Sequence, residues 1–440
     1  MSPIGATTSS VANLLQLNYQ AGVTRQFNDD YPNLRYVRQN SRAITAEGDE
    51  AVIAIETGLN EGGSFHGESA DVADSGHPAI DTVRVRLKQM TFRLRITLKL
   101  MRKARTNSHA FARGLQKQME ATRDAVTLTA NQYLWGDGSG VMARVAAVGD
   151  LDAANQIVFD RAYGIDDGGA PESLIRKGQV IHILDTKGYE DGVTDSRGRG
   201  IVQSVDWDPA SPGEITVTFR PGHTFEAQAN FDVGDYVYLQ NTIEGWLDDD
   251  ETEDNRPAMG LLGFFDHELR EELQGLDVTD EPMWKAEPIP ISQESVISDL
   301  RHMRNRVAKR IRRGRINYAI SSYETHERYA AELDEKVEFR NVNRFDSGWD
   351  FDNFYGRPWF MDHTAPDGRV FCIPTGDVIQ RYAVTQFIEF VDEGAGMMQL
   401  VPNKTVFDVM LSAIYEYGIK RRNALISGTG ITWEAGSTPE

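Results

Sequence analysis

The alternation of apolar and polar residues near the start of the chain predicts a β-hairpin. Residues 51–55 form a short apolar run, and a segment rich in Gly and Ser occupies residues 58–76. Beyond it, Val83, Val85 and Leu87 alternate with basic residues, a period of two that is typical of a half-buried strand. A hairpin of two strands is marginally stable alone, so we expect it to lie on another surface.

The apolar positions then change from odd to even numbers across Gln89 and Met90. The later set comprises Phe92, Leu94, Ile96, Leu98 and Leu100. Because successive side chains of a strand point to opposite faces, this shift requires a bulge, or a strand that packs against a different surface in its second half.

A long amphipathic helix is predicted over residues 108–135. Asn107 or Ser108 is a suitable N-cap. The apolar positions that follow are spaced by three, four or seven: Phe111, Leu115, Met119, Thr122, Val126 and Tyr133. About 25 residues at ~1.5 Å each give a rod of roughly 37 Å. The helix should stop at the W-G-D-G-S-G segment, with Gly136 placed as a C-cap.

Residues 150–287 change character, with short β runs between Gly and Pro turns, which predicts a small antiparallel barrel or sandwich. The runs are 180–184, 201–205, 214–219 and 235–239. Near the end of this stretch, residues 248–254 are almost entirely acidic. They lack the alternating ligands and the Gly of a calcium loop, so we interpret them as a solvated acidic loop, with a cation site as the alternative.

The last third mixes helices and strands without strict alternation, which defines an α+β fold. Helices are predicted at 292–313 and 322–333. Strands are predicted at 316–320, 359–362, 370–373, 378–382, 387–391 and 406–417.

Composition excludes several classes of protein. The 440 residues suggest about three structural units. A single cysteine, Cys372, excludes an internal disulfide framework and sites built from several cysteines. No secretory start and no long apolar run occur, so we expect a soluble cytosolic product. The net charge of −20 argues against coating of nucleic acid, which needs excess Lys and Arg.

The charge is segregated along the sequence. Residues 84–123 hold twelve Lys or Arg and one acid, Glu120, a net +11, and residues 301–315 add eight more without an acid. The remaining 26 basic and 65 acidic groups give −39. Solvated basic faces are one interpretation. The other is self-association, in which positive segments of one copy meet negative segments of its neighbours.

Motifs for chemistry are absent from the sequence. There is no phosphate loop, dinucleotide fingerprint or nucleophile elbow. His267 and Glu268 begin like a zinc-protease helix, but Glu271 stands where the second histidine must be. We therefore expect no cofactor, no metal and no catalytic residue.

The order of these parts resembles that of the major capsid protein of tailed bacteriophages, whose fold encapsulin compartments share. The resemblance rests on a polar arm, a Gly-rich hairpin, a basic alternating strand, a long helix with its W-G-D-G terminator and two later segments. In this sequence they are residues 1–47, 56–76, 91–103, 110–140, 356–359 and 417–424.

The resemblance implies a phage major-capsid fold with an inserted all-β domain. The expected parts are an N-terminal arm (1–47), an extended loop (48–90), a peripheral domain (91–149 and 403–440) that contains a spine helix (108–135), the inserted domain (150–287) and an axial domain (288–402).

The implied function is that of a subunit that self-assembles into pentamers and hexamers of an icosahedral shell around double-stranded DNA. The resemblance implies a virion location, assembly in the host cytoplasm, no membrane, and scaffolding, portal, decoration or cement proteins as partners. Two alternatives stay open. One is an encapsulin-like compartment with protein cargo, and the less favoured one is a soluble carbohydrate-active enzyme.

Two expectations concern contacts between subunits. Some shells of this family are joined covalently through a lysine of the extended loop, but this sequence has no lysine before Lys88, so we expect no such cross-link. We also expect basic residues of the two positive segments to contact neighbouring copies, and the candidates are Arg93, Arg95, Arg102, Arg105, Arg310 and Arg313.

Overall fold

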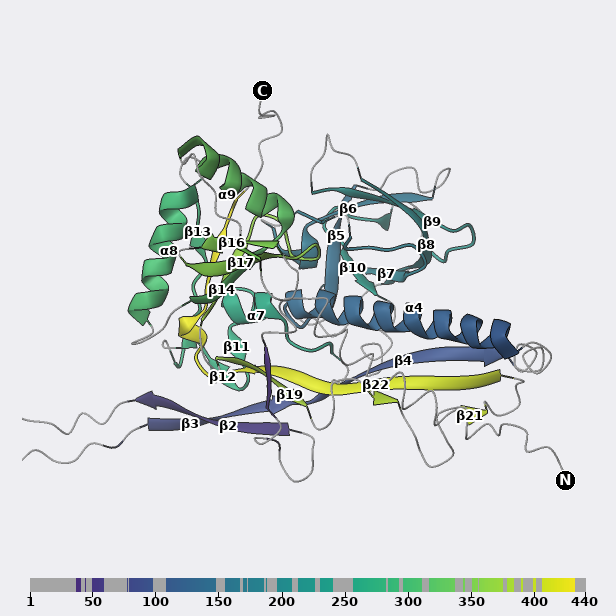
Figure 1. Cartoon of the computed structure of the whole chain (residues 1–440), viewed down its shortest axis with the longest axis horizontal. Helices are drawn as coiled ribbons and strands as arrows, with labels where there is room; N and C mark the ends of the chain where they lie inside the picture. The colour runs from purple at the N-terminus through teal and green to yellow at the C-terminus, as the bar shows by residue number, and fades with distance from the viewer. Residues whose placement is uncertain are drawn as a thin grey trace, which may run out of the picture.

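A computed structural model of the chain forms several modules around two long strands (Figure 1). It describes residues 37–40, 44, 50–58, 77, 79–97, 108–147, 155–166, 169–171, 173–185, 187, 196–207, 213–225, 230–239, 256–281, 284–292, 296–310, 316–336, 343–344, 350–354, 356–374, 378–383, 389–390, 399–400 and 406–431. The acidic segment 248–254 and most of the predicted arm lie outside these residues.

The predicted hairpin and the predicted change of packing surface are both present. Strands β2 (Glu50–Gly58) and β3 (Ala79–Arg86) pair only with each other in the described chain, as an antiparallel two-stranded sheet. The strand is interrupted at Leu87. It continues as β4 (Lys88–Thr97), which pairs with β22 (Val406–Ile419) in a different sheet. The shift from odd to even apolar positions therefore marks a strand that passes from one sheet to another.

The sheet around β22 has six strands. Its other members are β1 (Arg38–Asn40), β19 (Ile379–Ala383), β20 (Glu389–Phe390) and β21 (Gln399–Leu400). All pairs are antiparallel except β1 with β19. In Figure 1, β4 and β22 run side by side beneath the long helix.

That helix, α4, spans Ser108–Trp135, the predicted residues. It ends where the Gly136 N–H donates to the Tyr133 carbonyl at 3.2 Å. Gly136 directly follows the last helical residue, the position expected of a C-cap, but its φ is not positive, and positive φ angles occur at Gly138 (82°) and Gly140 (85°). The helix therefore ends without a left-handed cap, and the two later glycines make the turn into the next strand.

The predicted barrel is closed and antiparallel. Its strand order is β10 (Tyr236–Leu239), β5 (Val141–Ala147), β6 (Gln156–Asp160), β9 (Ile215–Phe219), β8 (Ser196–Trp207) and β7 (Val180–Leu184). Strand β5 lies before residue 150, where the β-rich stretch was expected to start. The barrel needs this strand to join β10 to β6, so it begins directly after the glycine turn that ends α4.

The remaining module is a seven-stranded mixed sheet with two helices. Its order is β13 (Ile289–Pro290), β23 (Ile426–Thr429), β18 (Val370–Pro374), β14 (Ile316–Ser321), β17 (Arg357–Met361), β16 (Asp350–Phe354) and β15 (Asn343–Arg344). Helix α8 (Val296–Arg310) buries an apolar stripe in a core shared with this sheet, and α9 (Tyr323–Lys336) packs beside α8. The stripe is Val296, Leu300, Met303 and Val307.

A buried arginine ties the end of the chain to the centre of the molecule. Arg422, in a short 3₁₀ turn (Arg422–Ala424), is fully buried and donates to four carbonyls around α7 (Leu261–Phe265). The acceptors are Gly263 (2.9 Å), Phe264 (3.2 Å), Asp266 (3.1 Å) and Arg270 (2.6 Å). Burial lowers the pKa of Arg422 to about 10, so it remains charged at neutral pH.

Candidate subunit-contact surface

The β2–β3 hairpin has one covered and one open face. Alternate residues of both strands are buried, among them Ile53 and Val83. Near its base, Val85 lies over Gly418 of β22, where a Cβ on Gly418 would come within 3.0 Å of the Val85 Cγ2. A side chain at this position would press on Val85 of the hairpin and, at 2.6 Å, on the Tyr382 ring of β19.

The opposite face of the hairpin is exposed and partly apolar. Ile80 is 62% exposed and Val52 is 38% exposed. Arg84 on the same face is 3.6 Å from Glu50 in an ion pair, and its side chain is 70% exposed. A two-stranded hairpin is marginally stable alone, so a further surface over this face would stabilise it.

The junction between β3 and β4 is fixed by a buried ion pair. The Lys88 ammonium lies 3.5 Å from the Glu416 carboxylate and donates to the Pro257 carbonyl at 3.0 Å. The other Glu416 oxygen accepts from the backbone N–H groups of Met259 and Tyr417. Burial raises the pKa of Glu416, and the charge of Lys88 opposes that rise. These contacts set the position from which the hairpin leaves the sheet.

Two of the predicted contact arginines lie together on the open face of β4. The register of β4 on β22 places Arg95 directly opposite Asp408 and Arg93 opposite Met410. Both guanidinium groups reach Asp408, Arg95 at 3.0 Å and Arg93 at 3.5 Å. Two cations thus share one carboxylate, and both arginine side chains stay about half exposed, at 48% and 57%. The hydrogen bond to Asp408 raises the pKa of Arg95.

The structure does not test the other predicted arginines. Arg310 is the last residue of α8, the helix that packs on the seven-stranded sheet. Its side chain is outside the described part of the structure. Arg102, Arg105 and Arg313 also lie outside it. Their part in contacts between copies stays a prediction.

A second polar cluster, which the sequence did not reveal, lies at the end of α4. Asp137 is buried, and its carboxylate is 2.9 Å from the Lys187 ammonium, while its backbone carbonyl accepts from Arg270 at 3.2 Å. Burial acts to raise the pKa of Asp137, but Lys187 and the Ser139 hydroxyl outweigh it, and the net pKa is lowered. The D-G-S-G sequence predicts a turn. It does not predict that Lys187 and Arg270, both distant in the sequence, contact Asp137.

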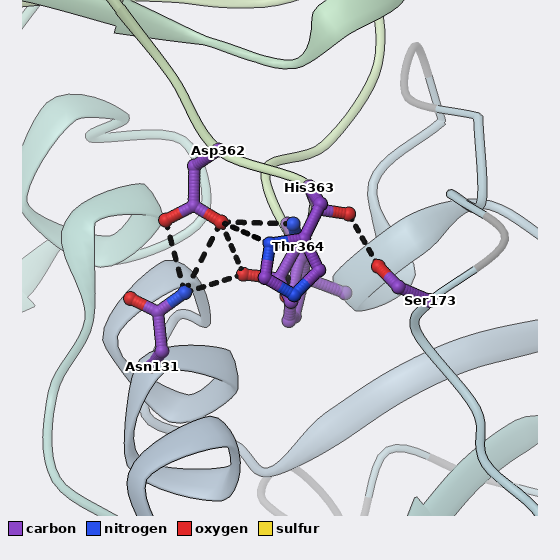
Figure 2. A network of polar contacts seen from close by, with 6 residues as sticks. Asn131, Ser173, Asp362, His363 and Thr364 are labelled. Carbon is purple, nitrogen blue, oxygen red and sulfur yellow. Dashed lines mark hydrogen bonds and ion pairs between the residues drawn. The ribbon is translucent and has the colours of Figure 1, made fainter. Parts of the chain in front are cut away.

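A third cluster joins the helix, the barrel side and the seven-stranded sheet (Figure 2). The Asn131 amide of α4 donates to both Asp362 oxygens, at 3.1 and 2.9 Å, and to the Thr364 hydroxyl at 2.6 Å. The Tyr163 hydroxyl donates to the Thr364 carbonyl at 2.7 Å, and Ser173 donates to the His363 carbonyl. Burial raises the pKa of Tyr163 well above its usual value. The cluster therefore links α4 to the turn that follows β17 through buried hydrogen bonds.

A pair of carboxyl groups lies where the turn between β17 and β18 meets the barrel side. A Cβ on Gly169 would come within 3.5 Å of the Asp367 Oδ2, an oxygen with no hydrogen-bond donor. Burial, and then the charge of Glu324 in the first turn of α9, raise the pKa of Asp367 to about 8. This pair is sensitive to pH in a range where most carboxyl groups are ionised.

Among the described residues, no group of three or more His, Cys, Asp or Glu side chains is arranged to hold a metal ion. No helix in the described part of the chain is long and apolar enough to cross a membrane. Cys372 is buried in the core beneath α8, and burial raises the pKa of its thiol.

No family model matches the sequence, and no curated protein matches it. Among solved structures, the chain is similar in fold to a chain of the cyanophage A-1(L) capsid, with a TM-score of 0.49 and 10% identity over 91% of this chain and 93% of that one. It is also similar to a capsid chain of the native GTA particle, with a TM-score of 0.41 and 6% identity over 90% and 89%.

The SrpI encapsulin of Synechococcus elongatus PCC 7942 is similar over less of the chain, with a TM-score of 0.28 and 9% identity over 35% of this chain and 55% of that one. These likenesses concern the course of the backbone. The function proposed next therefore rests on the contacts of this chain itself.

Proposed function

We propose that this chain is a major capsid protein, a subunit that self-assembles into pentamers and hexamers of an icosahedral shell around the double-stranded DNA of a tailed phage. The β2–β3 hairpin carries the proposal. Its outer face exposes Ile80 and Val52, and in the described chain no third strand pairs with it. A neighbouring copy that covers this face supplies the missing burial.

The other parts of the chain take matching roles in this proposal. The arm (1–47) and the extended loop (48–90) reach neighbouring copies, and α4 is the spine of a peripheral domain formed by 91–149 and 403–440. The stretch 288–402 is the axial domain, and 150–287 is an inserted β-rich domain. The polar clusters at Asp137 and Asn131 hold these parts at fixed angles.

In this proposal, basic segments of one copy form ion pairs with acidic groups of a neighbouring copy. Among the described residues, Arg93 and Arg95 both pair with Asp408 and stay about half exposed, so they can also pair with an acidic group of a neighbouring copy. We extend this role to Arg102, Arg105, Arg310 and Arg313. A contact between two different patches of identical copies generates rings, as pentamers and hexamers require.

The role is structural, without an active site. The shell encloses DNA without sequence-specific binding, since the net charge of −20 disfavours tight phosphate contacts. Assembly takes place in the host cytoplasm, and scaffolding, portal, and decoration or cement proteins are the expected partners. No lysine precedes Lys88, so the shell holds without loop-lysine cross-links.

Electron microscopy of the purified chain tests the proposal. We expect monodisperse icosahedral particles from the wild-type protein. Ile80→Asp should fold but fail to assemble, because it places a charge on the contact face. Val233→Asp is the matched control, since Val233 is 71% exposed on a turn of the barrel module, and it should assemble normally. A soluble monomer, or equal assembly of the two variants, contradicts the proposal.

The contents of the particles separate the alternatives. Packaged nucleic acid in particles from the host supports the capsid, whereas protein cargo without nucleic acid indicates an encapsulin-like compartment. Cleavage of a polysaccharide by the monomer would indicate a carbohydrate-active enzyme. A ladder of covalent multimers linked through the extended loop on a denaturing gel would contradict the absence of cross-links.

A further inference from the structure

Two adjoining clefts at the junction of β4, α4 and the barrel are lined by an excess of cations. The first has a volume of about 540 Å³, and its described lining holds Lys88, Arg176, Lys177 and Arg256 and no carboxylate. This lining stands out in a chain with 66 acidic and 46 basic residues.

The second cleft, of about 450 Å³, shares Lys88 and Arg256 with the first and extends to the base of the hairpin. Its other lining cations are Arg84, Arg86 and Arg270, against the carboxylates Glu272 and Glu416. Together the described linings hold seven cations and two carboxylates. Two of the seven cations already have carboxylate partners, Lys88 with Glu416 and Arg84 with Glu50.

The first cleft also has an apolar floor. Met90 and Phe92 of β4, Tyr133 of α4 and Leu239 of β10 line it and are only partly buried. Its rim is open at Lys177, which is exposed beside Gly178, where a Cβ would meet nothing within 4 Å. A cationic rim over an apolar floor fits a peptide that carries acidic groups next to apolar ones. A DNA duplex has no apolar side chains for such a floor.

The sequence of this chain contains a segment of that chemistry. Residues 248–254 hold six Asp or Glu, and Trp246 and Leu247 directly precede them. We propose that the two clefts bind residues 246–254 of a second copy of this chain, an inference that rests on the proposed shell function. Each copy then offers one cleft surface and one acidic segment, and this pairing of unlike patches repeats around a ring.

Cysteine cross-linking in assembled particles tests the pairing. Copies that carry Lys177→Cys are co-assembled with copies that carry Asp250→Cys and are then oxidised. The native Cys372 is buried and unreactive, so it stays in place. We expect disulfide-linked dimers on a non-reducing gel for at least half of the mixed pairs. The matched control, Lys309→Cys on the exposed side of α8, should give a yield at least tenfold lower.

The outcomes separate this inference from the proposed function. If the wild-type chain forms no particles, the shell function fails. Particles without a cross-link above the Lys309→Cys control overturn the inference alone. A chain with both substitutions that forms only an internal link also overturns it, because the segment then lies on its own copy.

A second measurement covers the case in which the cysteine variants do not assemble. Wild-type particles are assembled from equal amounts of ¹⁴N- and ¹⁵N-labelled chains and treated with a carbodiimide, which joins an amine directly to a carboxylate in contact with it. Mass spectrometry should find peptides that link Lys177 to residues 248–254 in mixed-isotope form. Links found only within one isotope, or none at Lys177, contradict the proposal.

Discussion

The Asp408 carboxylate of β22 accepts a hydrogen bond of 3.0 Å from the guanidinium of Arg95, which lies directly opposite it on β4. The carboxylate is nearly buried, while the arginine is about half exposed. Because Arg93 approaches the same carboxylate at 3.5 Å, two arginines share this one carboxylate among the described residues. The pair thus serves the fold of its own chain and leaves positive charge on the surface.

We predict that removal of the arginines affects assembly more than folding. The variant Arg93→Gln, Arg95→Gln, Asp408→Asn removes all three charges together and leaves no buried carboxylate unpaired. Its melting temperature should stay close to that of Asp408→Asn alone, which keeps both arginines. Only the triple variant should lose assembly, measured as the particle fraction in sedimentation. Equal assembly of the two variants would show that the arginines serve only Asp408.

Removal of one partner of the Lys88–Glu416 ion pair should lower the free energy of unfolding. Lys88→Met leaves the buried Glu416 carboxylate without its cation, so we expect a loss of about 3 kcal/mol in the free energy of unfolding. Glu416→Gln, added to Lys88→Met, removes the unpaired charge and should restore most of that loss. Urea unfolding of the unassembled subunit measures both. A single variant as stable as the wild type would mean that the pair is unimportant.

Much of the fold could be predicted because its signals are local. The period-two pattern and its shift near Gln89 located the passage from the hairpin to the β22 sheet, and apolar spacing with a glycine terminator located α4. The start of the barrel was missed because β5 follows the turn directly, with no change in composition. Its place in the barrel depends on pairing with β10 and β6.

The candidate contact surface could be predicted only in part, for a physical reason. The basic strand was visible in the sequence, but the partner of Arg95 is set by the register of β4 against a strand more than three hundred residues later. The same holds for Glu416 beside Lys88 and for Lys187 beside Asp137. Among 66 carboxylates, spacing along the chain does not select a partner.

Gly260 packs closely against the backbone at the end of α4, which gives a prediction on packing. A Cβ on Gly260 would lie 2.3 Å from the Gly136 carbonyl oxygen and 2.6 Å from that of Tyr133, so Gly260→Ala must push the helix end away. We expect a loss of about 2 kcal/mol in the free energy of unfolding. Gly136→Ala is the control, since its Cβ would meet its nearest atom at 3.5 Å without a positive φ, and it should change stability by less than about 0.5 kcal/mol. Equal effects would contradict this packing.

The carboxyl pair of Asp367 and Glu324 predicts how stability depends on pH. The pKa of Asp367 rises from its ordinary 3.8 to about 8 in the folded chain, because the group is buried and faces Glu324. Between these values the folded chain holds a proton that the unfolded chain releases, so stability should fall as the pH rises through this range and level off above it. Asp367→Asn cannot ionise, and its unfolding midpoint in urea should depend less on pH. The stability of the variant relative to that of the wild type should therefore rise from pH 5 to pH 8. A constant difference would mean that Asp367 is ionised in the folded chain. Asp206→Asn, at an exposed position of β8, is the control and should follow the wild type at every pH.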